Sequence, residues 1–287
     1  METIGSQKIW TFSGTGRSAT PATCTAVRHG DACAVRDYMD LATKVAELQF
    51  RNRDFVLMFR GQDADHRNRS GNTTMKARLM RPEPNSTKLP SATTIRHRFE
   101  KLAAAEVALV REYKRLGLLG RQPLERQRIL RWSILQHYEI CDTPLLDVTH
   151  SLRIAASFAS ENAGDTAYLF VLGVPHISGA ITASAEAGLQ IVRLASVCPP
   201  AAVRPHIQEG YLLGEYPDVA SPEQKQLYKN FEVDFGRRLI AKFSFDPDRF
   251  WRKSGPFPRV PHNALYPLAA DDPMCGLVEA VEAALER

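Results

Sequence analysis

Helix-like and strand-like hydrophobic patterns alternate along this chain from about residue 35 to its end, and this alternation limits the folds open to it. Apolar residues recur at helical spacing in five segments, at about 35–50, 96–116, 123–138, 151–159 and 272–285. Short apolar or alternating runs predict strands at 55–59, 166–174, 190–197, 207–213 and 239–245. No repeat and no clear linker interrupts the series, so the pattern predicts a single α+β domain with helical insertions.

The ends of this domain follow from composition. Residues 1–30 are rich in Ser, Thr, Gly and Ala without clear periodicity, and predict an N-terminal tail or a loosely packed lead-in. The domain then covers residues 31–287, with a core from about 50 to 287 and a helical insertion at about 96–138. Residues 63–95 are polar and irregular, and long ordered loops of this kind are often functional.

Several classes of protein are disfavoured by what the sequence lacks. With 44% hydrophobic and 24% charged residues the composition is that of an ordinary globular protein, and no run of about 18 apolar residues predicts a membrane span. Residues 1–6 do not resemble a secretion signal, and the five cysteines are scattered without a CxxC pair, which predicts a cytoplasmic protein without a disulfide framework. The histidines and cysteines show no metal-ligand spacing, so no metal is expected, and the Walker loop, GxSxG, GxGxxG and HExxH signatures are absent.

Positive charge is concentrated in one part of the chain. Between residues 51 and 131 there are 19 Lys or Arg against 8 Asp or Glu, a net charge of +11 in a chain whose total is +5. A basic region of this size is suited to phosphates, either those of a nucleotide or those of RNA or DNA. A set of solvated helix faces would show the same charge pattern, so both interpretations stay open.

The first candidate site segment is Phe59-Arg60-Gly61-Gln62, at the end of a predicted strand. The Arg60 guanidinium could form a forked contact with a phosphate or carboxylate, and Gly61 would let the backbone approach a ligand closely. The alternative is a surface arginine before a turn glycine, which spacing alone favours.

Two further segments place polar residues at the ends of helices. His137, in Leu135-Gln136-His137-Tyr138, is either a site residue or a histidine that interacts with the last carbonyls of its helix. Asp147 and Ser151 lie where an extended segment turns into a helix N-terminus, a natural place to hold a polar ligand. Simple capping of that helix accounts for Ser151 equally well.

The fourth segment is the predicted strand at 207–213. Gln208 and Gly210 would share one face of this strand, and Gly210 makes room there, so Gln208 is the expected cleft residue. Glu209 would then be either a surface residue or an acid among apolar neighbours with a perturbed pKa.

Taken together, these segments resemble the FRG domain family, named for the run that stands here as Phe59-Arg60-Gly61. The matching segments occur in order over about residues 50–287; they are Phe59–Gln62, Leu135–Tyr138, Thr143–Thr149 with Ala155–Ala159, Gln208 with Gly210, and more faintly Ala264–Pro267. The sequence departs from the family at Glu139, where a glycine is usual, and in a loop to Thr143 that is one residue longer.

The resemblance also implies a fold and an activity. The family's layout is similar to that of ADP-ribosyltransferases, which implies a split β-sheet core and an enzyme that uses NAD to modify a protein or a nucleic acid. The family is widespread in bacteria and their mobile elements, which implies a toxin or anti-phage role, with an antitoxin as a partner. The basic region at 51–131 would meet the acceptor. The alternative is a non-catalytic module that binds a nucleotide or a partner protein.

Residue roles follow from the same resemblance. Arg60 would bind the NAD pyrophosphate, with Gly61, Gln62, His137 and Ser151 completing the NAD site. Asp147 or Ser151 would hold the nicotinamide ribose. Gln208 or Glu209 would orient the acceptor or stabilise the positive charge that develops as the nicotinamide bond breaks, so that Asp147, Gln208 and Glu209 form the expected catalytic set.

Overall fold

The computed structural model describes residue 4 and residues 7–14, 16–83, 89–221, 223–224 and 234–286. Within these residues its main feature is an eight-stranded sheet of order β3-β10-β6-β4-β5-β9-β8-β7. In that order, the strands are Cys33–Ala34, Leu239–Phe245, Ala167–Val174, Val56–Gln62, Leu146–Thr149, Gly210–Glu215, Leu189–Arg193 and Ile181–Ser184. Neighbouring strands are antiparallel except β3 and β10, which are parallel.

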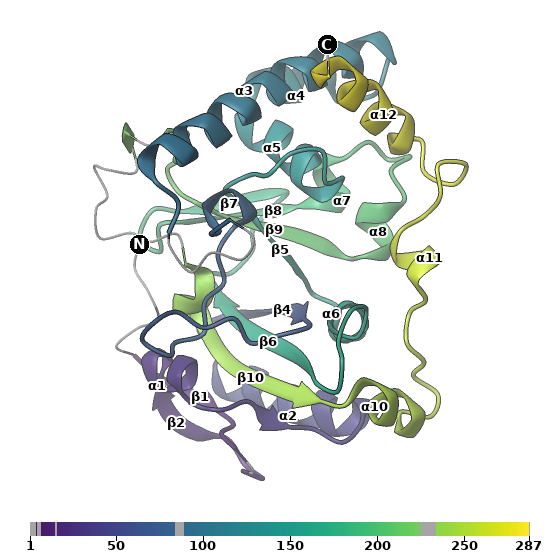
Figure 1. Ribbon diagram of the computed structural model, residues 1–287. Helices are drawn as coiled ribbons and strands as arrows, with labels where there is room; N and C mark the ends of the chain where they lie inside the picture. The colour runs from purple at the N-terminus through teal and green to yellow at the C-terminus, as the bar shows by residue number, and fades with distance from the viewer. Residues whose placement is uncertain are drawn as a thin grey trace.

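The sheet consists of two halves that meet at one point. Strands β4 and β6 are paired along the whole of β4, whereas β4 and β5 are paired only through Phe59 and Thr149. Figure 1 shows the halves diverging from this contact, with β4, β6 and β10 in the lower one and β5, β9, β8 and β7 in the upper one. We call the line between β4 and β5 the seam.

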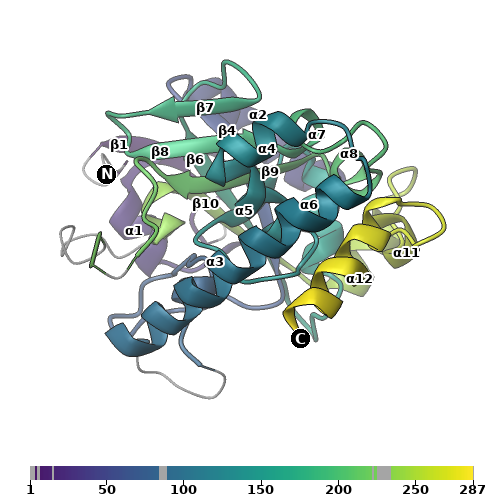
Figure 2. The same cartoon turned by 90° about the horizontal axis from the view of Figure 1, so that it is seen from above.

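Helices cover the outer faces of both halves. In chain order they are α1 (Cys24–His29), α2 (Tyr38–Arg51), α3 (Ala92–Arg115), α4 (Arg121–Arg126), α5 (Arg128–His137), α6 (Leu152–Ala159), α7 (Leu194–Val197), α8 (Arg204–Ile207), α10 (Pro247–Lys253), α11 (His262–Leu265) and α12 (Met274–Leu285), with 3-10 turns η1 (Arg78–Met80) and η2 (Phe235–Arg238). Helices α1, α2 and α10 lie below the lower half, and α3, α4, α5 and α12 above the upper half (Figure 1). Seen from above, the long α3 crosses the molecule beside α12, on which it packs (Figure 2). None of the described helices combines the length and apolar character needed to cross a membrane.

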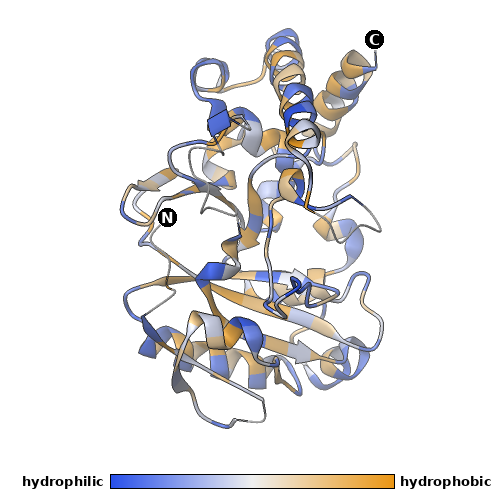
Figure 3. Ribbon diagram, turned by 60° about the vertical axis from the view of Figure 1, so that its left-hand side comes forward, coloured by the Kyte–Doolittle hydropathy of each residue, from blue (hydrophilic) through white to orange (hydrophobic). Residues whose placement is uncertain are grey.

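Local patterns predict α2, α3, α6 and α12 and the strands β4, β6, β8, β9 and β10, although not all of their ends. The α+β class is confirmed, and Figure 3 shows strands that are mostly hydrophobic beside helices that mix hydrophobic and polar residues. The helix predicted at 123–138 is instead two helices, α4 and α5, because the backbone at Gln127 is extended. The strand predicted at 190–197 ends at Arg193, and the next four residues form α7.

The prediction of a tail at residues 1–30 is wrong for the part of it that the structure describes. Strands β1 (Lys8–Thr11) and β2 (Thr20–Thr23) form a hairpin that leads into α1. Ile9, Phe12 and Cys24 are buried in the main core. The apolar side chains of this N-terminal region are few and irregularly spaced, so no periodic pattern predicts these elements. Their burial depends on β10, against which β1 and α1 pack.

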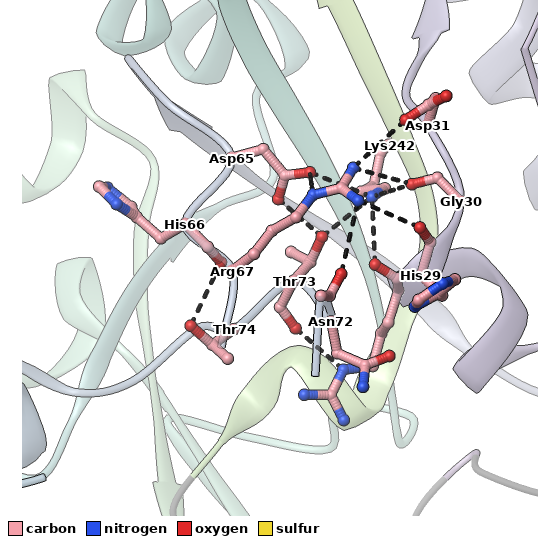
Figure 4. A network of polar contacts seen from close by, with 12 residues as sticks. His29, Gly30, Asp31, Asp65, His66, Arg67, Asn72, Thr73, Thr74 and Lys242 are labelled. Carbon is pink, nitrogen blue, oxygen red and sulfur yellow. Dashed lines mark hydrogen bonds and ion pairs between the residues drawn. The ribbon is translucent and has the colours of Figure 1, made fainter. Parts of the chain in front are cut away.

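A buried polar network connects this N-terminal region to the loop that follows β4. Lys242 of β10 is 1% exposed, and its ammonium donates to Gly30 O at 2.6 Å, Thr73 Oγ1 at 2.9 Å and Asp65 Oδ2 at 3.1 Å. Arg67 closes the network from outside, because its guanidinium donates to Asp65 and to the carbonyls of His29 and Gly30 (Figure 4). We call this set the Lys242 network; it holds residues 65–73 against α1 and β10.

Candidate functional site

A pocket of about 730 Å³ lies at the seam between the two halves of the sheet. One wall is the end of β4 from Phe59 to Gln62, and the facing wall is β5 with the end of α5. The rim is formed by the turn before β9, the end of α6 and the segment around α11. Pockets of several hundred Å³ hold ligands of the size of a nucleotide or a drug.

Arg60 reaches this pocket from β4. Its Nη1 donates to the main-chain carbonyl of Asp147 at 2.6 Å, while its buried Nε has no hydrogen-bonding partner among the described residues. Burial and then the nearby Arg81 guanidinium lower the pKa of Arg60 to about 10, and Asp147 and Tyr266 oppose this shift. Arg60 is therefore still a cation at neutral pH, and it keeps a donor free for a ligand.

Gly61 has a structural role that the sequence does not predict. A Cβ atom on Gly61 would lie 1.9 Å from the carbonyl oxygen of Ala155 and 2.5 Å from the amide nitrogen of Ala159. Both alanines belong to α6, whose small side chains let it lie directly on β4, as their sizes predict. The missing side chain at Gly61 is thus accounted for by the approach of a helix, whereas the sequence predicts the approach of a ligand.

Asp147 is held in the pocket by a chain of hydrogen bonds. Gln136 Nε2 donates to Asp147 Oδ2 at 2.7 Å, and Gln136 Oε1 accepts from Thr143 Oγ1 at 2.7 Å. The hydroxyl of Thr143 in turn accepts from the amide of Leu145 at 3.2 Å. Burial raises the pKa of Asp147, although the Arg60 guanidinium and the Gln136 bond oppose the rise.

His137 lines the same pocket at the end of α5. It is 3% exposed, and its Nε2 is buried without a partner among the residues that the structure describes. Burial, followed by the charge of Arg204, holds the pKa of His137 well below its ordinary value, so the ring is neutral at physiological pH. A neutral ring with an unpaired nitrogen can exchange a hydrogen bond with a ligand.

The prediction that Gln208 and Glu209 lie in a strand is wrong. Helix α8 ends at Ile207, β9 begins at Gly210, and the two residues form the turn between them. Gln208 lines the pocket, and its Nε2 donates to the carbonyl of Leu265 at 2.7 Å. Glu209 has a φ of 44°, is exposed and is not part of the pocket lining, so the structure brings only Gln208 to Arg60.

Of the remaining predicted residues, Gln62 lies in the pocket lining and Ser151 does not. Gln62 lines the pocket, with its buried Oε1 unpaired in the described part of the chain. Ser151 is the first residue before α6, but its hydroxyl makes no capping bond and it does not line the pocket. The Thr149 hydroxyl instead accepts the Ser151 amide at 3.0 Å and donates to the carbonyl of Gln208 at 2.8 Å.

Three arginines in the pocket were not predicted. Arg78 and Arg81 come from η1 and the residue after it, inside the polar segment 63–95, and Arg204 begins α8. Burial and the neighbouring Arg78 lower the pKa of Arg81. Arg78 pairs with Asp142 at 3.1 Å, and Arg204 with Glu139 at 2.9 Å. Two sequence signals include Arg78 and Arg81, the polar segment 63–95 and the basic region 51–131, and neither singles out these two residues.

Aromatic rings and acids complete the rim. The Arg204 guanidinium lies over the ring of Tyr266, 4.6 Å from its centroid, and Phe158 meets Tyr266 edge to face. Glu161 and His262 lie beside them. The pocket therefore combines guanidinium groups with flat apolar surfaces, which suits a ligand with phosphates and aromatic rings.

Glu139 explains one departure from the family pattern noted in the sequence. Its φ is 60°, in the left-handed region that favours glycine. A glycine, the residue that the resemblance implies at this position, would adopt this conformation without strain, and this chain has a glutamate there.

Comparison with known proteins supports the resemblance over part of the chain. Residues 56–167 match the family model of the FRG domain. This stretch runs from β4 through α6 and includes Arg60, His137 and Asp147, whereas the residues that follow it supply Gln208 and the rest of the rim. No curated protein and no solved structure matches the chain.

Proposed function

We propose that this chain, which carries the FRG match over residues 56–167, binds NAD in the seam pocket and transfers its ADP-ribose to a protein or nucleic acid. One observation carries the proposal: the Arg60 guanidinium, with a buried donor unpaired among the described residues, shares one pocket with the Asp147 carboxylate and with Gln208. A fixed cation suits the pyrophosphate, and a carboxylate suits the ribose carbon on which positive charge develops.

The layout of the pocket supports the same proposal. The arginine strand β4, the Thr149–Ser151 segment leading into α6, and Gln208 just before β9 all meet at the seam of a sheet whose halves are joined by one residue pair. This is the arrangement that the likeness to ADP-ribosyltransferases implies. Arg60 and Arg81 would bind the two phosphates.

In this proposal Asp147 is the catalytic carboxylate and Gln208 is a positioning residue. The Asp147 carboxylate accepts from Gln136 and its main-chain carbonyl accepts from Arg60, so its position is well determined. The Gln208 amide already donates to the carbonyl of Leu265, so Gln208 orients the α11 segment and does not itself contact the substrate. Glu209 lies outside the pocket lining and has no catalytic role in this proposal.

A second candidate, binding of a nucleotide without catalysis, is favoured by one observation. Glu209 is exposed and outside the pocket lining, and Gln208 carries no charge, so Asp147 is the one member of the predicted catalytic set that brings a carboxylate to the pocket. The two functions differ in one measurable step, because only the enzyme releases nicotinamide from NAD.

The acceptor is proposed to meet the basic helices α3 to α5. Many of their charges are already paired, as with Arg96 and Glu223 or Arg121 and Glu125. Arg131 and Trp132 both donate to the nearly buried Glu106. Since such pairing uses part of the positive charge of region 51–131, a protein acceptor and a nucleic acid both stay within the proposal.

The test compares NAD binding and nicotinamide release in the wild type, Arg60→Ala and Arg60→Lys. Loss of a charge-assisted hydrogen bond is worth about 1.5–3 kcal/mol, so Arg60→Ala should weaken NAD binding about 10- to 100-fold by calorimetry. Arg60→Lys should recover only part, because an ammonium cannot replace the forked guanidinium. Arg126→Ala, an exposed arginine outside the pocket, is the control and should bind as the wild type does.

Two outcomes would decide against the proposal. Equal NAD affinity in the wild type and in a folded Arg60→Ala would remove Arg60 from the site. Tight NAD binding by the wild type with no nicotinamide release, even with cell lysate or RNA as acceptor, would favour the binding module.

A further inference from the structure

The rim of the pocket contains a carboxylate–histidine pair that the proposed roles above do not use. Glu161 Oε2 lies 2.7 Å from His262 Nδ1, and both residues line the pocket. Glu161 also accepts a hydrogen bond from Arg259 on its other oxygen. The pair joins positions 101 residues apart in the chain.

The protonation of this pair follows from its contacts. Hydrogen bonds from His262 and Arg259 lower the pKa of Glu161 in spite of its partial burial, so the carboxylate is ionised. An ionised carboxylate only accepts, so His262 Nδ1 must carry the hydrogen, and whenever the ring is neutral its lone pair is on Nε2. The His262 side chain is 69% exposed, and within the described residues no group pairs with Nε2.

The position of the ring is well supported. Glu161 follows the end of α6, and the segment carrying His262 packs on that helix through Val260 and Leu265, which form a small core with Ile154. The amide of Val260 donates to Ser157 Oγ at 3.0 Å. Gln208 fixes the other end of the segment through the carbonyl of Leu265.

Tyr266 connects the pair to the proposed centre of reaction. The His262 ring stacks on Tyr266 with centroids 4.9 Å apart and an angle of 30° between the planes. Tyr266 is close enough to Arg60 to oppose the lowering of the Arg60 pKa. It is also close enough to Asp147 that the Asp147 carboxylate helps to raise the pKa of Tyr266. The pair thus lies at the solvent side of the pocket, where an acceptor would arrive.

We propose that His262, oriented by Glu161, is the general base that activates a hydroxyl acceptor, an assignment that rests on the proposed use of NAD. The acceptor O–H gives its proton to His262 Nε2 while its oxygen forms the new bond to C1′ of the ribose. The bond from C1′ to nicotinamide breaks, and its electron pair leaves with neutral nicotinamide. The imidazolium that results is stabilised by the Glu161 carboxylate until the proton passes to water.

The test uses methanol as a simple hydroxyl acceptor and follows methyl ADP-ribose and nicotinamide formed from NAD. General base catalysis contributes about 10²- to 10⁴-fold, so His262→Ala should slow methanol transfer by at least that lower factor. Added imidazole should restore part of the rate, because the exposed position leaves room for it. His176→Ala, an exposed histidine after β6 and outside the pocket lining, should behave as the wild type does.

The pH profile gives a second measurement. The charged and titratable groups near the ring are Glu161 at the end of α6, Arg259 bonded to it, Tyr266 below, and Arg204 from α8 over Tyr266. Transfer by the wild type should fall when acid protonates the general base, and His262→Ala should lose this dependence on pH. Glu161→Gln should keep imidazole-independent transfer at an intermediate rate, because Gln still accepts from Nδ1 but does not stabilise the imidazolium.

The outcomes separate this inference from the proposed function. Wild-type protein that neither binds NAD nor releases nicotinamide would overturn both. Wild-type turnover together with unchanged methanol transfer and pH profile in His262→Ala would overturn the role of His262 alone. Histidine ¹⁵N NMR provides a check without turnover, since a neutral ring protonated on Nε2 would also contradict the assignment.

Discussion

Across the seam of the sheet, Nη1 of Arg60 donates a hydrogen bond to the main-chain oxygen of Asp147, at a distance of 2.6 Å. The two residues are 87 positions apart and lie on β4 and β5, the strands whose pairing is limited to Phe59 and Thr149. A side chain therefore bridges the strands where their backbones have separated. This bond connects the two walls of the pocket and places the charge of Arg60 beside the Asp147 carboxyl.

Gly61→Ala should destabilise the protein strongly. The new Cβ would lie 1.9 Å from the carbonyl oxygen of Ala155, and because that atom belongs to the backbone of α6, the helix must move away from β4. We expect a loss of about 3 kcal/mol or more in the free energy of unfolding, measured by urea denaturation. Gly276→Ala, in α12 with no atom near its Cβ, should instead be neutral or slightly stabilising, and equal effects of the two would contradict this account.

Asp147→Asn should separate stability from activity. Burial raises the pKa of Asp147 in the folded state, so folding favours the protonated carboxyl. The stability this contributes is complete below the ordinary value of 3.8 and is lost as the pH rises through the folded-state pKa. The neutral amide avoids that loss, so the variant should resist urea better than the wild type at pH 8, with a smaller difference at pH 4. The variant should also lose nicotinamide release. If its stability relative to the wild type were lower at pH 8 than at pH 4, that result would contradict a raised pKa of Asp147.

Glu139→Gly should stabilise the protein modestly. A residue with a side chain costs about 1–2 kcal/mol in the left-handed conformation that Glu139 adopts, and the greater flexibility of glycine offsets part of this gain. The ion pair with Arg204 is half exposed at Glu139 and contributes little. We expect a net gain of about 0.5–1 kcal/mol in thermal or urea unfolding. Glu139→Ala keeps the unfavourable Cβ and loses the pair, so a gain in that variant too would argue against the conformational explanation.

Lys242→Met should destabilise the loop that leads into the pocket. The ammonium is buried and bonded to Asp65, Thr73 and the carbonyl of Gly30 (Figure 4). Its removal takes a buried donor from all three, although Arg67 still donates to Asp65 and Gly30. Breaking a buried pair by deleting one partner costs about 3–5 kcal/mol. Lys253→Met, at an exposed position in α10, should change stability by less than about 0.5 kcal/mol. Hydrogen exchange should show faster opening of residues 65–73 in the first variant only.

Local patterns were sufficient for the elements around the centre of the site. Residues 56–59 are consecutive apolar residues of a buried strand, and the small residues of α6 predict close packing on a sheet. Arg60, Gln62, His137, Asp147 and Gln208 were predicted from their motifs, and all five line the pocket. The pocket tests only their position, and their roles stay predictions.

The failures have a different origin. Glu209 was placed in a strand because its neighbours are apolar, but the positive φ at this residue comes from the turn between α8 and β9. Ser151 precedes a helix as predicted, yet its hydroxyl caps no amide of α6, and its own amide donates to the Thr149 hydroxyl. In both cases a turn, with no periodic pattern of its own, decided where the side chain lies.

The order of the longer strands and helices from about residue 35 onward, and the polar residues beside them near the seam, were determined by the sequence alone, because side-chain spacing acts over a few neighbouring residues. Only the tertiary structure decided that Arg81 lies near Arg60, that Gln208 bonds to Leu265, and that Glu161 meets His262. These contacts join residues from 21 to 101 positions apart through the packing of α6, β4 and the α11 segment. No local pattern encodes such distances, since they depend on how the two halves of the sheet are held apart.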